Sequence, residues 1–73
     1  MVRRDKFINK IRELNYCYKG QQKRTYLYRK RGGTHYISVS MRELLEDIYV
    51  RSALHQAGLK DSEIEDFLKS VKS

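Results

Sequence analysis

The chain contains no proline and no tryptophan, and it has only four glycines and one cysteine. Hydrophobic residues make up 40% of the chain, so it has the apolar content that disordered segments lack. A single cysteine cannot form an internal disulfide, and it excludes a zinc site built on cysteine pairs. The composition therefore predicts a folded domain without a metal ion or other cofactor.

Long hydrophobic runs are also absent. No stretch of about 18 apolar residues is present, so no membrane-spanning helix is expected. The basic residues at the start are not followed by an apolar stretch, so no secretory signal is expected. With 73 residues, the chain is expected to form one domain, residues 1–73. Its core is expected to be thin, because short chains bury a smaller share of their surface. We expect a cytoplasmic protein without a deep active site.

Acidic residues are scarce in the first part of the chain. Residues 1–40 hold 11 of the 16 lysines and arginines but only two of the nine acids, and the whole chain carries a net charge of +7. The densest cationic stretch, residues 19–31, contains no acid and is interleaved with Tyr26 and Tyr28. Cations beside aromatic rings suit phosphates and stacked bases. The charge therefore predicts a polyanion partner, and no membrane.

The N-terminal apolar residues have a helical period. Phe7, Ile8, Ile11 and Leu14 fall on one stripe, which predicts an amphipathic helix. Asp5 is a candidate N-cap, and Asn15 is a candidate end.

Two strand segments follow this helix, at residues 16–18 and 26–40, joined by a polar, basic loop at residues 20–25. Gly32 and Gly33 divide the second segment, and Gly-Gly favours a two-residue hairpin turn. That turn places Tyr28 opposite Ile37, Tyr26 opposite Val39 and Lys30 opposite His35. Because side chains alternate along strands, we assign the face with Ile37 and Val39 to the core.

Two helices are expected after the hairpin. Residues 40–43 read as a capping box, with a helix beginning there or a few residues later, and Gly58 is suited to end it. Residues 62–65 form a second capping box before a short terminal amphipathic helix. The predicted fold class is α+β, in the order α-β-β-β-α. It has a three-stranded antiparallel sheet, helices packed on one face and a short extra C-terminal helix.

Several strings resemble the HicA-family toxins, whose fold is like the double-stranded-RNA-binding domain. Residues 51–59, Arg-Ser-Ala-Leu-His-Gln-Ala-Gly-Leu, are similar to a helix end of that family. Residues 34–40 resemble its third strand, and Lys19-Gly20 resembles the start of its catalytic loop. The resemblance covers about residues 5–70. It implies an endoribonuclease that cuts messenger RNA in a prokaryotic toxin–antitoxin system and is held inactive by a HicB-type antitoxin.

The family's catalytic histidine has no counterpart here. The matching stretch reads Gly20-Gln21-Gln22-Lys23-Arg24, and no histidine precedes His35. Lysine and arginine are protonated near pH 7, so they remove a proton less readily than histidine. Lys23 and Arg24 are the candidate catalytic residues, and His35 is a weaker one. Whether the chain is an enzyme is left open at this point.

The sequence thus favours RNA binding through the phosphate backbone, with little base specificity. The predicted binding residues are Lys6, Lys10, Lys19, Lys23, Arg24, Arg29, Lys30 and Arg31. The alternative is a non-catalytic interaction module whose basic face binds an acidic protein, since either polyanion is attracted. A homodimer formed through a sheet edge is also open.

Overall fold

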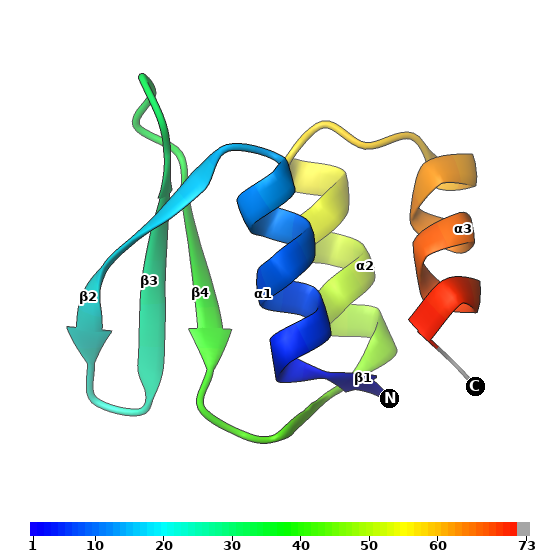
Figure 1. The fold of residues 1–73 in the computed structure, drawn as a ribbon, viewed down its shortest axis with the longest axis horizontal. Coiled ribbons are helices and arrows are strands. Elements are labelled where there is room, and N and C mark those ends of the chain that lie inside the picture. Colours follow the sequence, from blue (N-terminus) through cyan, green and yellow to red (C-terminus); the bar gives the residue numbers. More distant parts are fainter. Residues whose placement is uncertain (72–73) are drawn as a thin grey trace.

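The computed structural model describes residues 1–71 as three helices and two antiparallel sheets (Figure 1). The elements are β1 (Val2–Arg3), α1 (Arg4–Glu13), β2 (Tyr16–Gln22), β3 (Thr25–Lys30), β4 (Tyr36–Ser40), β5 (Leu44–Leu45), α2 (Asp47–Gln56) and α3 (Asp61–Val71). The larger sheet has the order β2-β3-β4, and β1 pairs with β5. In Figure 1 the larger sheet lies at the left, α3 at the right, and α1 and α2 between them. The predicted α+β class is confirmed, whereas the two-stranded sheet was not predicted.

The hairpin of β3 and β4 has the predicted register. Tyr28 pairs with Ile37 and Tyr26 with Val39, and the amide of Lys30 donates to the carbonyl of His35 at 2.9 Å. Tyr28, Ile37 and Val39 are buried, as expected for the face that meets the helices.

β2 is longer than the sequence predicted. It continues to Gln22 and pairs with β3 as far as Thr25, with a bulge at Lys19. The predicted loop at residues 20–25 is therefore wrong, and the turn consists of Lys23 and Arg24 alone. The polar residues of this segment show no apolar alternation, and pairing with β3 makes them a strand. Lys19 and the bulge lie on an edge strand, where both features oppose pairing with a second sheet.

The first helix begins earlier than predicted and ends as predicted. Arg3, rather than Asp5, is the N-cap, because the amide of Arg4 donates to the carbonyl of Glu43 at the small sheet. Asn15 follows the helix with a φ of 70°, a left-handed conformation that asparagine tolerates.

Neither predicted capping box is formed. Ser40 ends β4 and its hydroxyl accepts from the amide of Arg42 at 3.2 Å, and α2 begins only at Asp47 because residues 44–45 pair with β1. At α3 the Glu63 carboxylate accepts from the amide of Lys60 at 2.9 Å. The helix therefore begins one residue before Ser62.

One core joins the helices to the larger sheet. Its fully enclosed members come from β1, β4 and all three helices; they are Val2, Phe7, Ile11, Val39, Val50, Leu54 and Ile64. Phe7 meets Tyr49 of α2 edge-to-face, with ring centroids 6.1 Å apart. These contacts set α1 against the helix-facing side of the sheet.

Gly58 ends α2 as predicted. The Leu59 amide donates to the Leu54 carbonyl at 3.1 Å and the Gly58 amide to the His55 carbonyl at 3.0 Å, which is the Schellman arrangement. The φ of Gly58 is +99°, and the space around it is open. A side chain there is opposed by backbone strain alone.

Gly58→Ala is expected to lower the free energy of unfolding by about 1–3 kcal/mol, because alanine must adopt the left-handed conformation. Gly33→Ala is the matched control, since a Cβ there meets the Lys30 side chain at 3.4 Å and the Lys30 carbonyl oxygen at 3.9 Å, and no left-handed φ is required. Urea denaturation of both variants measures the difference. Equal losses of stability would contradict the explanation.

Candidate functional site

The structure distributes the predicted phosphate-binding cations over several surfaces. Lys6 and Lys10 line a groove between α1 and α3 together with Glu63 and Asp66. The Lys10 ammonium lies 3.8 Å from a Glu13 carboxylate oxygen and 5.7 Å from the centre of the Phe67 ring. These two lysines therefore face the acidic C-terminal helix.

The cations of the larger sheet also point in different directions. Arg29 shares the outer face with Tyr36, and its Nε donates to the Gly33 carbonyl at 2.7 Å. The Lys30 ammonium donates to the Leu14 carbonyl at 2.9 Å. Leu14 is the C-cap of α1, so Lys30 provides a hydrogen-bond donor for a carbonyl that has no partner within the helix.

The remaining predicted cations are Lys19, Lys23, Arg24 and Arg31, and all four are exposed. Lys19 lies at the β2 bulge, and Lys23 and Arg24 form the β2–β3 turn. Arg31 follows β3 at the opposite end of the sheet. The eight residues do not form a single surface.

The candidate catalytic residues do not converge either. His35 precedes β4, at the end of the hairpin opposite Lys23 and Arg24. Its Nδ1 lies 2.6 Å from the Tyr16 hydroxyl, and the two rings meet edge-to-face. This contact positions His35 against the sheet rather than against the exposed turn.

A different cluster brings cations and aromatic rings together. Two adjoining hollows between α1 and the larger sheet, of about 340 and 500 Å³, share Tyr18 and Tyr28. We call this surface the tyrosine groove; its defining residues are Arg4, Ile8, Arg12, Tyr18, Tyr26, Tyr28 and Arg31. Hollows of this size are within the range of about 300–1,000 Å³ typical of ligand sites.

Local sequence explains why these side chains meet. Arg4, Ile8 and Arg12 are four residues apart, so they lie along one side of α1. Tyr26 and Tyr28 are two residues apart on β3 and share the helix-facing side of the sheet. Tyr18 pairs directly with Tyr28 across the ladder.

The Tyr18 ring contacts the rings of Tyr26 and Tyr28 edge-to-face. The Tyr18 and Tyr28 ring centroids are 5.8 Å apart, and those of Tyr18 and Tyr26 are 6.2 Å apart. The Arg4 guanidinium lies 5.8 Å from the centre of the Tyr26 ring and donates to the Met41 carbonyl. Arg4 is thus held in place at one end of the groove.

Positive charge in the groove is weakly compensated. Within residues 1–71, neither Arg12 nor Arg31 forms an ion pair with an acidic side chain. Among residues 1–71, Asp5 is the one acid that lines the groove. Its Oδ1 lies 3.4 Å from the Arg3 Nε and accepts from the Lys6 amide. An anion entering the groove therefore meets unpaired guanidinium groups.

Tyr28 stays neutral at physiological pH. Burial raises the pKa of Tyr28, and the guanidinium groups of Arg12 and Arg4 oppose this only in part. Its phenol can therefore donate a hydrogen bond to an anion. Burial likewise raises the pKa of Tyr16.

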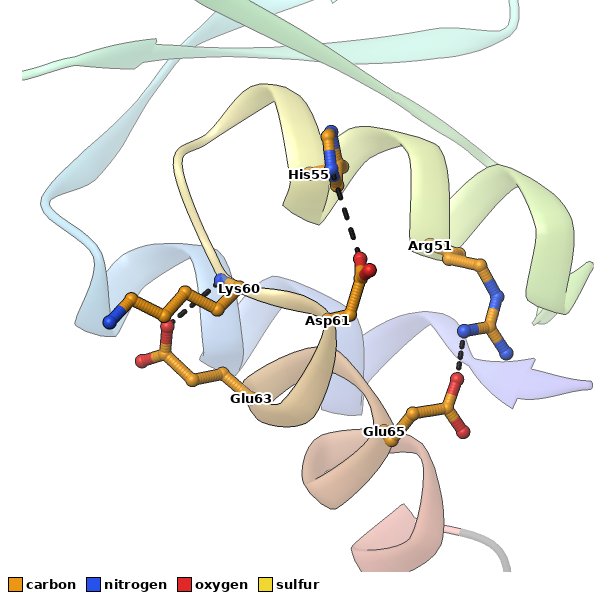
Figure 2. A network of polar contacts seen from close by, with 6 residues as sticks. All are labelled: Arg51, His55, Lys60, Asp61, Glu63 and Glu65. Carbon is orange, nitrogen blue, oxygen red and sulfur yellow. Dashed lines mark hydrogen bonds and ion pairs between the residues drawn. The ribbon is translucent and has the colours of Figure 1, made fainter.

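Three acids of α3, Asp61, Glu63 and Glu65, have partners away from the groove. Figure 2 shows Glu65 directed at Arg51 of α2 and Asp61 at His55, with Glu63 bonded to the Lys60 amide. His55 Nε2 and Asp61 Oδ1 are 3.8 Å apart. These exposed pairs join α3 to α2, and the tyrosine groove keeps its positive charge.

Residues 1–71 contain no group of three or more histidine, cysteine, aspartate or glutamate side chains that could hold a metal ion. Over the same residues, none of the helices has the length and apolar character required to cross a bilayer.

Comparison with family models, curated proteins and solved structures finds no match for this chain. The tyrosine groove must therefore be interpreted from its own geometry. Sequence reasoning included Arg31 and noted the tyrosines, but it missed Arg4 and Arg12. Their four-residue spacing with Ile8 was the available signal, since it places both arginines on one side of the predicted helix.

Proposed function

We propose that the chain is an RNA-binding domain and that the tyrosine groove is its binding surface. The observation that carries the proposal is the arrangement of Arg4, Arg12 and Arg31 around contiguous tyrosine rings. Guanidinium groups bind phosphates in planar, bidentate geometry, and aromatic rings bind bases. The carboxylates of an acidic protein would pair with the arginines but would not stack on the rings. The combination of arginines and rings therefore favours RNA over an acidic protein.

The biological setting proposed for this binding is a toxin–antitoxin system in the cytoplasm. The resemblance of residues 51–59 and 34–40 to HicA-family toxins supports it. A HicB-type antitoxin is then the proposed protein partner.

Binding is proposed in preference to cleavage. The catalytic loop implied by the resemblance corresponds to β2 and the exposed Lys23–Arg24 turn, which has no histidine. Both cations are poor bases near neutral pH. His35 lies at the other end of the hairpin and contacts Tyr16.

Fluorescence anisotropy with a short labelled RNA tests this proposal. Three phosphate contacts on a single strand predict that log K falls with log salt at a slope of about −2. The titration is repeated at salt concentrations between about 50 and 200 mM, and then with polyglutamate as competitor. Absence of RNA binding, a flat salt response, or tighter binding of polyglutamate would contradict the proposal. Gel analysis of the same RNA reports cleavage separately.

A further inference from the structure

We propose that the tyrosine groove selects unpaired RNA, with one base stacked on the ring of Tyr18. This inference rests on the proposed function and adds the class of RNA that is bound. It begins from the exposure of Tyr18, which is 55% exposed although its cross-strand partner Tyr28 is only 7% exposed. Tyr18 thus presents an aromatic surface inside a cationic groove.

Neither neighbouring tyrosine occupies a parallel-stacked position on the Tyr18 ring. The planes of Tyr26 and Tyr28 are inclined to that of Tyr18 by 61° and 70°, so neither ring lies parallel to it. Both contacts nevertheless restrain the ring, which reduces the conformational entropy lost when a base stacks on it. A planar base is the partner that such a ring accepts.

The arginines are spaced for one strand running along α1. Arg4 and Arg12 are eight residues apart, which is about 12 Å at 1.5 Å per residue. That length corresponds to about three or four stacked nucleotides at 3.4 Å each. Tyr18 lines the Arg4 hollow and the Arg12 hollow alike, so a base on its ring belongs to a strand whose phosphates reach both arginines.

Base pairing would block this arrangement. In a duplex each base is stacked between its neighbours, so its ring face is not available to a protein side chain, whereas unpaired bases can be splayed onto aromatic residues. Arginine contacts alone would tolerate a duplex. The exposed Tyr18 ring is therefore the feature that discriminates between the two forms.

Tyr18→Ala provides the test, with Tyr36→Ala as the matched control. Tyr36 is 50% exposed and lies on the outer face of the same sheet. Tyr18→Ala is expected to weaken binding of single-stranded oligoadenylate by about 5- to 150-fold, the loss of one stacked base. Tyr36→Ala is expected to bind as wild type does, and Tyr18→Phe, which keeps the ring, is expected to recover most of the affinity.

Two further probes separate stacking from phosphate binding. An abasic strand of equal length keeps the phosphates but has no bases, so Tyr18→Ala and wild type should bind it equally. The oligoadenylate–oligouridylate duplex should bind wild type more weakly than the single strand does. Thermal melting confirms that each variant is folded.

The outcomes distinguish this inference from the proposed function. Salt-dependent RNA binding that is unchanged by Tyr18→Ala, or that is as tight for the duplex, overturns single-strand selection and leaves RNA binding in place. Failure of the wild type to bind any of these RNAs overturns both.

Discussion

The double variant Arg12→Glu/Arg31→Glu is expected to lose RNA affinity by at least about 100-fold, because it removes two charge-assisted contacts of about 1.5–3 kcal/mol each. Neither arginine has an ion-pair partner in residues 1–71, so the substitutions break no internal salt bridge there. The same anisotropy titration measures the loss. The salt slope should also change from about −2 to about −0.7, since each phosphate contact on a single strand contributes about −0.7.

Two variants with the same change in net charge show whether position matters. Arg42→Glu/Lys60→Glu alters exposed residues outside the tyrosine groove, so it reports the effect of overall charge alone. Lys23→Glu/Arg24→Glu tests the β2–β3 turn that the sequence had favoured. If either pair weakens binding as much as the groove pair does, the groove is not the principal RNA site.

Phe7→Ala is expected to lower the free energy of unfolding by about 3–5 kcal/mol, the range for removing a buried aromatic ring. Phe7 is fully buried and contacts Tyr49, so its loss leaves a cavity between α1 and α2. Domains of this length have stabilities of about 4–11 kcal/mol at 0.05–0.15 kcal/mol per residue. The substitution therefore removes a large part of the total stability.

Chemical denaturation followed by circular dichroism measures this effect. Ile48→Ala is the control, because Ile48 is also a large apolar residue but is 73% exposed. We expect it to change stability by no more than about 0.5 kcal/mol. Similar losses for the two variants would show that α1 does not depend on the core contact.

Much of the fold could be predicted from local patterns. The glycine pair before β4 and the alternation in β3 and β4 gave the correct hairpin register, since side-chain direction reverses at each strand residue. Asn15 and Gly58 correctly marked the ends of α1 and α2 because both accept left-handed backbone. These signals depend only on a few neighbouring residues.

Errors arose where distant segments pair. Leu44 and Leu45 read as the start of a helix, yet they pair with Val2 and Arg3, and this pairing also moves the start of α1. Residues 20–22 read as a loop, yet β3 supplies them with a strand partner. Backbone hydrogen bonds between residues far apart in the chain leave no local pattern.

The positive charge of residues 1–40 follows from composition, and the sequence also shows tyrosines placed among these cations. The choice of cations depends on packing. Lys6 and Lys10 turn toward α3, Lys30 binds the end of α1, and Arg12 is directed into the groove instead. Composition gives the number of charges but not the direction in which each side chain points. Which cations share a surface is decided only when the helices pack against the sheet.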